Sequence, residues 1–245
     1  MGSTFGIHND INFPVDEAIE NNRPYVFLNV VQSADGRTEI EGKASGLGTD
    51  IDRSVMRTLR SRADAVMIGG ATVRAERLSL SLDAQDARPV PRAVILSRSG
   101  NLPLESNLVR DNRQSVLVLL SDNADKSVER RLGRLAEIRR VPATESGAID
   151  VANALGILKN EYGIEVLLCE GGPTLIGALI SANLADELFV TLAPVLVGAD
   201  TPKEPGTFLN DRPGDPIGDP IPLRLISSQA AGHELFLRYS IAWRR

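Results

Sequence analysis

The sequence predicts an α/β fold in which a mostly parallel sheet carries helices on both faces and ends in an antiparallel C-terminal edge. Short apolar segments alternate with amphipathic segments through the middle of the chain, which is typical of parallel strands joined by helices. Near the C-terminus, two long apolar segments are joined by a proline-rich loop, which favours an antiparallel pair. We expect residues 1–22 to form an N-terminal tail and residues 23–245 to form one domain.

The first strand is predicted at residues 25–31, where β-branched and aromatic residues follow Pro24. Asp35-Gly36 marks a turn after this strand. A helix is predicted from 51 to 62, because its apolar residues recur at helical spacing and Asp50 is suited to cap it.

The remaining elements follow from the same patterns. Strands are predicted at 65–68, 93–96, 116–120 and 164–169, and helices at 124–137 and 150–161. A long strand is expected at 188–197, followed by a loop at 198–222. The chain then returns in a strand whose alternate residues share one apolar face: Leu235, Leu237, Tyr239, Ile241 and Trp243.

Composition excludes several classes of function. The 27 Lys and Arg against 32 Asp and Glu give a net charge of −5, so we expect no nucleic-acid partner. Apolar runs are too short for a membrane span, and the N-terminal residues lack the pattern of a secretory signal. Cys169 is the single cysteine, which fits the cytoplasm, and with only two histidines we expect no metal site.

The most informative segment joins a predicted strand to a predicted helix through Glu170-Gly171-Gly172-Pro173-Thr174. Glycines let backbone N–H groups approach an anion closely, and a helix N-terminus adds partial positive charge. The segment therefore suits a phosphate or pyrophosphate, although a strand-to-helix turn without a ligand explains the glycines equally well. Glu170 favours the functional interpretation, because a carboxylate at this place has no evident packing role.

Three further segments end predicted strands. Gly69-Gly70 precedes Thr72 and suits a second phosphate or a ribose, Asn29 interrupts an apolar strand, and Ser97-Arg98 suits the 2′-phosphate of NADPH. Each of these segments can also be explained without a ligand. Gly69-Gly70 can belong to an ordinary loop, Asp35-Gly36 after the Asn29 strand can form a plain turn, and Arg98 can be a solvent-exposed side chain. Cys169 is expected to pack as a small core residue.

Taken in order, these segments resemble a known family, the RibD C-terminal reductases of riboflavin biosynthesis. The resemblance covers roughly residues 23 to 243. It rests on Arg23-Pro24-Tyr25 with Ser33-Ala34-Asp35-Gly36-Arg37, Leu59-Arg60 through Gly70-Ala71-Thr72-Val73, Pro91-Arg92 through Pro103, Leu168-Cys169-Glu170-Gly171-Gly172-Pro173-Thr174-Leu175, and Leu192-Ala193-Pro194 with Val197-Gly198.

The resemblance implies a dihydrofolate-reductase-like fold, a homodimer and NADPH as the hydride donor. It implies reduction of the ribosylamino group of a phosphorylated pyrimidine to a ribitylamino group, as in 5-amino-6-(5-phosphoribosylamino)uracil reductase. By position it implies substrate contacts at Asn29, Ser45, Arg60 and Glu170. It implies cofactor contacts at Gln32, Thr72, Glu76, Ser97, Arg98, Gly171, Gly172, Pro173, Thr174 and Leu175. No general acid or base is assigned.

The sequence departs from the family pattern in the substrate half of the site. Glu76-Arg77-Leu78 stands where riboflavin enzymes usually carry Asp-Asp-Pro, and Asp83 stands near the place of a phosphate-binding Arg. Two alternatives therefore stay open. One is a diverged reductase of the same fold that acts on another heterocycle, such as dihydrofolate or another pterin. The other is a nucleotide-binding protein without catalytic activity.

Overall fold

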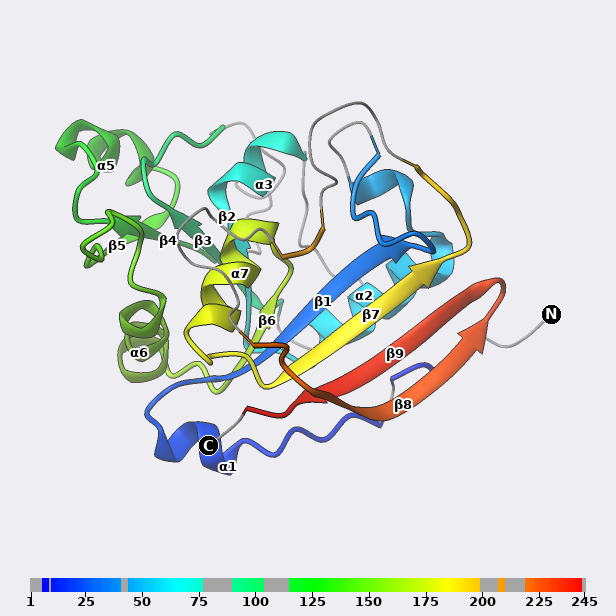
Figure 1. Ribbon diagram of the computed structural model, residues 1–245. Helices are drawn as coiled ribbons and strands as arrows, with labels where there is room; N and C mark the ends of the chain where they lie inside the picture. The colour runs from blue at the N-terminus through cyan, green and yellow to red at the C-terminus, as the bar shows by residue number, and fades with distance from the viewer. Residues whose placement is uncertain are drawn as a thin grey trace. The chain divides into compact units, whose positions relative to one another are not determined.

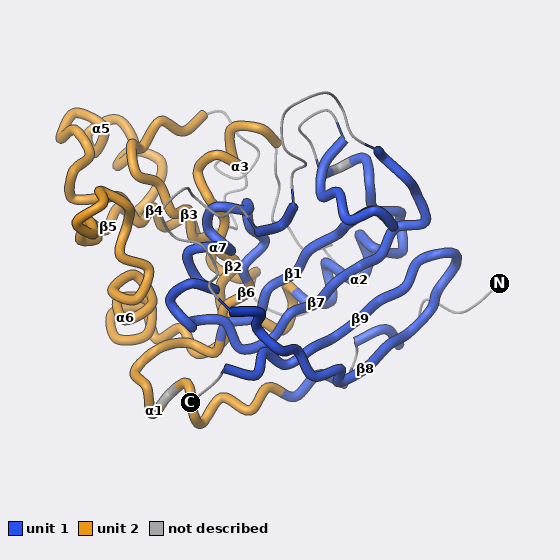
Figure 2. Tube along the Cα trace, viewed as in Figure 1, with its two compact units in different colours: residues 1–12, 26–59, 169–245 blue, residues 13–25, 60–168 orange. Residues whose placement is uncertain are grey.

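The computed structural model describes residues 6–8, 10–40, 44–76, 90–103, 115–198, 207–209 and 219–243 (Figure 1). The chain divides into two compact units, each built from segments that are far apart in the sequence (Figure 2). Unit 1 comprises residues 1–12, 26–59 and 169–245, and unit 2 comprises residues 13–25 and 60–168. The single domain expected over 23–245 stays a prediction.

Unit 2 is built on a parallel sheet. Its strands are hydrogen-bonded in the order β5-β4-β3-β2-β6. They are β2 (Ala65–Gly69), β3 (Arg92–Ser97), β4 (Val116–Ser121), β5 (Glu137–Val141) and β6 (Val166–Cys169), the last ending in unit 1. The helices are α1 (Asp16–Glu20), α3 (Gly70–Ala75), α5 (Lys126–Leu132) and α6 (Val151–Tyr162). The strands predicted at 65–68, 93–96 and 116–120 are confirmed, and most residues of β2, β3 and β4 are buried.

Helix α6 confirms the helix predicted at 150–161. The Asp150 side chain accepts a hydrogen bond from the Asn153 N–H at 3.0 Å, which satisfies one of the free donors at the helix start. Gly163 ends the helix with a φ of +66°, a conformation that glycine adopts without steric cost.

The helix predicted at 124–137 is wrong in its second half, because α5 ends at Leu132 and β5 begins at Glu137. The sequence did not indicate this edge strand because two of its residues, Arg139 and Arg140, are charged. Both arginines have partners within unit 2. Arg139 pairs with Glu161 at 2.6 Å. Arg140 donates hydrogen bonds to the carbonyl groups of Ser121, Asp122 and Ala124. An edge strand with one solvated side needs no apolar alternation.

Unit 1 contains the antiparallel edge. Its strands are β1 (Tyr25–Ser33), β7 (Glu187–Ala193), β9 (Glu234–Ile241) and β8 (Leu223–Ala231), hydrogen-bonded in that order. β1 and β7 are parallel, whereas β7–β9 and β9–β8 are antiparallel. The predicted antiparallel edge is confirmed. It also contains β8, a strand that we did not predict because it follows the proline-rich loop. β7 ends at Ala193 rather than Val197, because Pro194 cannot donate to the ladder.

Two helices belong mainly to unit 1. In Figure 1, α2 (Asp50–Arg60) lies behind β1 and β7, and α7 (Pro173–Ser181) is the helix that follows β6. A 3-10 turn, η1 (Ala44–Gly46), precedes α2, and Thr49 rather than Asp50 caps α2 through an Oγ1 that accepts the Ile51 N–H at 3.1 Å. The predicted α/β class, with parallel strands, an antiparallel edge and helices on both faces, is confirmed. No helix in the described part of the chain is long and apolar enough to cross a membrane.

The N-terminal segment contributes to the core of unit 1. His8 is buried, and its ring meets the Phe189 ring edge-on at 4.9 Å between centroids. Burial, followed by the charge of Arg238, lowers the pKa of His8 to about 4, so the imidazole is neutral at neutral pH. Arg238 in turn is held by two hydrogen bonds to the buried carboxylate of Glu187, at 2.7 and 2.8 Å.

Candidate cofactor and substrate site

The glycine pair between β6 and α7 has the geometry of an anion-binding turn. Gly171 has a φ of +85°, which favours glycine, and the Gly171–Gly172 peptide bond is cis. Gly172 caps α7 without a side chain, and Pro173 follows at the first turn. In the described part of the chain, the N–H groups of Gly172 and Thr174 have no intramolecular acceptor. Two free donors at the start of a nine-residue helix suit a pyrophosphate.

The residues around this turn differ in exposure. Pro173 and Thr174 are exposed, Glu170 is half-buried and Leu175 is buried in the core. Cys169 is fully buried, and burial raises the pKa of its thiol to about 12. The prediction that Cys169 packs as a small core residue is confirmed, and the thiol is not a nucleophile.

Strand β1 carries Asn29 and Gln32 on opposite faces. Asn29 is paired with Phe189 and Gln32 with Leu192 on β7, and successive side chains of a strand alternate between faces. Both side chains are partly exposed. Ser45 lies in η1, and its side chain is outside the described part of the structure. Unit 1 thus contains Asn29, Gln32, Ser45 and the Glu170–Leu175 segment, with Asn29 and Gln32 directed apart.

The predicted Asp35-Gly36 turn after β1 is present, and Asp35 has a definite structural role. Its carboxylate accepts hydrogen bonds from the Ser33 hydroxyl at 2.6 Å and from the N–H groups of Val197 and Gly198 at 3.1 and 2.8 Å. These bonds, that of Ser33 first, lower the pKa of Asp35 to about 2. The carboxylate therefore stays ionised and ties the end of β1 to the segment after β7.

Asp52, in the first turn of α2, is the main functional candidate that the sequence analysis missed. Its carboxyl is largely buried, accepts a hydrogen bond from Thr191 of β7, and lies close to the charges of Glu234 and Glu170. Burial is the largest cause that raises its pKa to about 6, and the charges of Glu234 and Glu170 act in the same direction. Glu234 is itself buried and accepts hydrogen bonds from the Thr49 N–H and hydroxyl at 3.1 and 2.6 Å.

A carboxyl with a pKa near 6 exchanges a proton near neutral pH, which is the property required of a general acid. The electrostatic interaction with Glu170 places Asp52 in the neighbourhood of a predicted substrate residue. The sequence offered only a weak signal. Three charged residues among the first four of α2 suggest a solvated face, and Thr191 is 139 positions away in the chain.

Unit 2 holds the other predicted residues. Thr72 lies within α3 and Glu76 ends it, with the Glu76 N–H donating to the Thr72 carbonyl at 2.9 Å. Ser97 is buried at the end of β3, and its Oγ accepts the Gly100 N–H at 3.0 Å. A Cβ added to Gly70 would lie 3.0 Å from that same Oγ, so α3 and the β3 turn are in close contact.

The two predicted arginines of unit 2 differ in environment. Arg98 is exposed on the turn after β3, where a guanidinium is accessible to a ligand. Arg60, at the end of α2, is 3% exposed, so any substrate contact uses only a small part of its side chain. Arg77, Leu78 and Asp83, which depart from the family pattern, lie outside the described residues.

A family model, sequence relatives and a solved structure all match this chain. The model of the RibD C-terminal domain family matches residues 24–237. The chain is 31% identical to a 2,5-diamino-6-ribosylamino-4(3H)-pyrimidinone 5′-phosphate reductase of Archaeoglobus fulgidus, over 74% of this chain and 85% of that relative. It is 28% identical to the protein of the same name from Methanothermobacter thermautotrophicus, over 89% and 99%. A solved pyrimidine reductase-like protein of Corynebacterium diphtheriae shares the fold with a TM-score of 0.77, at 20% identity over 97% and 98% of the chains.

Proposed function

Because the chain belongs to the RibD C-terminal domain family, we propose that it reduces the ribosylamino group of a phosphorylated pyrimidine to a ribitylamino group in riboflavin biosynthesis, with NADPH as the hydride donor. The observation that carries this proposal is the match to pyrimidinone phosphate reductases over 85% and 99% of their lengths. The substrate class is the one named for these relatives.

The reaction is a two-electron reduction at one carbon of the ribose. A hydride adds to C1′, the bond between C1′ and the ring oxygen breaks, and a proton is delivered to that oxygen. Bound NADPH would supply the hydride, and the chain's own residues would bind, orient and supply the proton. Asp52 is our candidate for the proton source, and Glu170 for orientation of the substrate.

Each unit offers groups that suit a part of a nicotinamide dinucleotide. In unit 1, the free N–H groups of Gly172 and Thr174 suit a pyrophosphate. In unit 2, the exposed Arg98 suits a phosphate on the adenosine ribose. The absence of a side chain at the start of α7 also leaves room for a ligand to approach the backbone.

We expect Arg98→Ala to weaken NADPH selectively. Only NADPH carries the 2′-phosphate, and a hydrogen bond to a charged group is worth about 1.5–3 kcal/mol, or roughly tenfold to a hundredfold in affinity. Isothermal titration of NADPH and NADH against the variant measures both losses. An equal loss for the two cofactors would remove Arg98 from the phosphate site.

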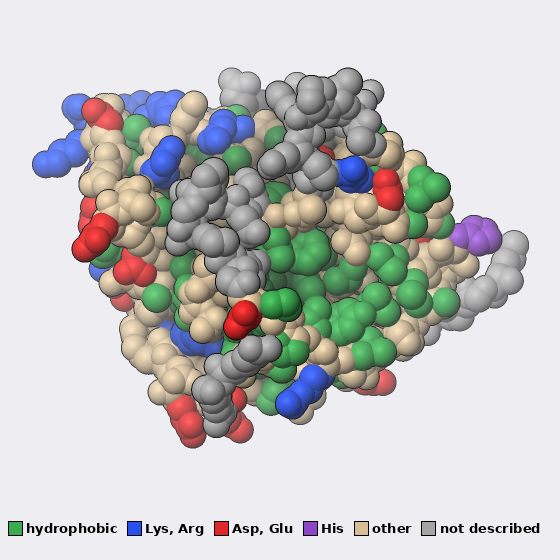
Figure 3. Space-filling model, viewed as in Figure 1, with side chains coloured by type: hydrophobic (Ala, Val, Ile, Leu, Met, Phe, Trp, Pro, Cys, Tyr) green, Lys and Arg blue, Asp and Glu red, His purple; other side chains and the backbone are tan. Residues whose placement is uncertain are grey.

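We also propose a homodimer formed through the outer apolar face of the unit 1 sheet. In Figure 3 hydrophobic side chains gather over β7, β9 and β8. The register places Leu223 and Leu225 of β8 on the same face as Ile241 and Tyr239 of β9. Leu225 is 57% exposed and Leu223 42%, and nearly every residue of β8 is exposed on both faces. Such an edge strand requires a partner or an alternative protection.

Leu225→Asp is expected to convert the dimer to a monomer, because a charge would be desolvated at the centre of the buried face. Sedimentation velocity over a range of concentrations measures the change. Leu135→Asp is the matched control, since Leu135 is 44% exposed but lies in unit 2. A wild-type protein that stays monomeric at every concentration would refute the dimer.

A substrate panel tests the activity itself. NADPH oxidation is followed with 2,5-diamino-6-ribosylamino-4(3H)-pyrimidinone 5′-phosphate, with the deaminated uracil analogue and with dihydrofolate. We expect oxidation with one or both pyrimidines. Oxidation with dihydrofolate alone would indicate the diverged reductase, and tight NADPH binding without turnover would indicate the nucleotide-binding protein without catalytic activity. Cys169 is the single cysteine of the sequence and excludes an intrachain disulfide, which is consistent with the cytoplasmic location that we propose.

A further inference from the structure

Helix α5 and the turn after it carry a cluster of arginines that has no role in the function described so far. A hollow of about 620 Å³ is lined by Ser127, Arg130, Arg131, Arg134 and Leu135. Ser127 lies one helical turn before Arg130 and Arg131, on the same side of α5. Figure 3 shows Lys and Arg side chains gathered over this helix, at the upper left of the view.

The cluster is fixed to the turn that follows β3. The Arg131 Nη2 donates a hydrogen bond to the Gly100 carbonyl at 3.0 Å, and the Gly100 N–H donates to Ser97 Oγ at 3.0 Å. Gly100 has a φ of +64°, and a Cβ at this position would collide with Val128 of α5. The helix and the turn therefore form one assembly within unit 2, and the hollow adjoins the Ser97–Gly100 turn.

The arginines of the hollow form no ion pair with the described residues, although the charge of Arg130 acts on the carboxylate of Asp125. In that part of the chain, no carboxylate lies within ion-pair distance of Arg130, Arg131 or Arg134. Glu129 of the same helix is engaged by Arg140 at 3.3 Å. By contrast, Arg139 in the same unit is paired with Glu161 at 2.6 Å. Three arginines and a serine line one hollow, and guanidinium groups have the charge and the planar donor geometry that a phosphate prefers.

We propose that Arg131, with Arg130 and Arg134, holds a phosphomonoester beside the Ser97–Gly100 turn, and that this group is the 2′-phosphate of the cofactor. The assignment rests on the proposed function, because it requires NADPH as the hydride donor. Arg98 would then not be the sole determinant of cofactor specificity. The second determinant would lie on α5, which follows β4, the next strand after β3 in the chain. Free inorganic phosphate shares the same chemistry and is the competing source.

Isothermal titration of the full chain with 2′,5′-ADP, 5′-AMP and inorganic phosphate separates these sources. We expect wild-type protein to bind 2′,5′-ADP more tightly than 5′-AMP. Arg134→Ala removes a guanidinium that makes no hydrogen bond to the described protein, so the fold of the turn is left intact. It should reduce the advantage of 2′,5′-ADP by about tenfold, the value of one charged hydrogen bond, and leave 5′-AMP unchanged.

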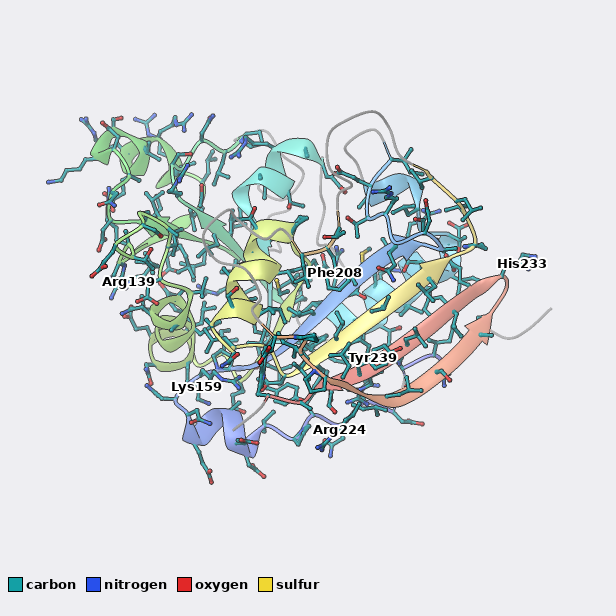
Figure 4. The ribbon with its side chains drawn as sticks, in the orientation of Figure 1. Arg139, Lys159, Phe208, Arg224, His233 and Tyr239 are labelled. Atoms are coloured by element: carbon teal, nitrogen blue, oxygen red, sulfur yellow. The ribbon has the colours of Figure 1, made fainter. Side chains whose placement is uncertain are left out.

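Two further variants sharpen the test. Arg131→Lys keeps the charge but loses the planar fork, so it should retain part of the advantage of 2′,5′-ADP. Arg139→Ala is the matched control, because Arg139 lies on β5 outside the hollow and is already paired (Figure 4). It should leave both affinities unchanged.

Three results would overturn the inference. An undiminished preference for 2′,5′-ADP in both Arg134→Ala and Arg131→Lys would show that the cluster does not contact the 2′-phosphate. Inorganic phosphate that binds to the cluster without competition from 2′,5′-ADP would assign the hollow to free phosphate. Failure of the wild-type protein to bind 2′,5′-ADP would overturn the NADPH assignment, and this inference with it, and would be evident before any variant is compared.

Discussion

Replacing Gly172 by valine is expected to weaken the binding of NADPH and NADH by the same factor. Both cofactors share the pyrophosphate, and a side chain at this position would separate it from the free N–H groups of Gly172 and Thr174. Each lost hydrogen bond to a charged group is worth roughly 1.5–3 kcal/mol, so losing two should cost at least about a hundredfold in affinity. Titration of both cofactors measures the loss.

The backbone conformation at Gly172 admits a side chain more readily than that at Gly171. The φ of Gly172 is −76°, which other residues adopt, whereas Gly171, with a φ of +85°, would be strained by any side chain. Thermal unfolding of the variant separates a loss of binding from a loss of folding. Gly156→Val in α6 is the matched control, since a Cβ there meets no atom within 4 Å. Unchanged cofactor affinity in Gly172→Val, with normal thermal unfolding, would remove the turn from the cofactor site.

Asp52→Asn is expected to stabilise the protein at alkaline pH and to lower its activity. The pKa of Asp52 is raised to about 6 in the folded protein, so the folded state favours the protonated form. Protonated Asp52 therefore contributes to the free energy of unfolding. This contribution is fully present below about pH 4 and is lost as the pH rises through 6. Asparagine mimics the neutral carboxyl, so the variant should unfold with a free energy about 2–3 kcal/mol larger at pH 8 and show no gain at pH 4.

Asp50→Asn provides the control for this pH dependence. Asp50 belongs to the same helix, but its side chain is 95% exposed and pairs with Arg53 at 2.6 Å. Urea unfolding at pH 4 and pH 8 measures the difference in free energy of unfolding between each variant and the wild type. If Asp52→Asn has the same free energy of unfolding as the wild type at both pH values, the raised pKa is contradicted. Full activity in this variant would exclude Asp52 as the proton source.

The sequence predicted those elements whose signals are local. Asp150 and Gly163 mark the two ends of α6 within a single helix, and the apolar runs of β2, β3 and β4 correspond to buried strands. Strand β5 was missed because it lacks apolar alternation: it pairs with β4 at the edge of the sheet, and its residues include the charged Arg139, which pairs with Glu161. β8 was missed because its residues are mostly exposed and follow a proline-rich loop.

The candidate site divides along the same line. Glu170-Gly171-Gly172 was recognised because the turn is contiguous, and the conformation of Gly171 now explains why glycine is required there. Asp52 was missed because its raised pKa comes first from burial and then from the charges of Glu234 and Glu170, which lie in distant segments of the chain. The arginines of α5 were missed because their meaning depends on contact with Gly100, 31 residues earlier. A single sequence does not reveal such contacts.

The most direct test of the account is isotope transfer from NADPH that carries deuterium in both C4 positions of the nicotinamide. The protein is incubated with this cofactor and 2,5-diamino-6-ribosylamino-4(3H)-pyrimidinone 5′-phosphate, and the pyrimidine product is analysed by mass spectrometry and NMR. We predict a ribitylamino product that carries one deuterium at C1′. Recovery of unreduced pyrimidine would contradict the proposed function. This holds whether the same preparation transfers deuterium to dihydrofolate or transfers it to none of the acceptors tested.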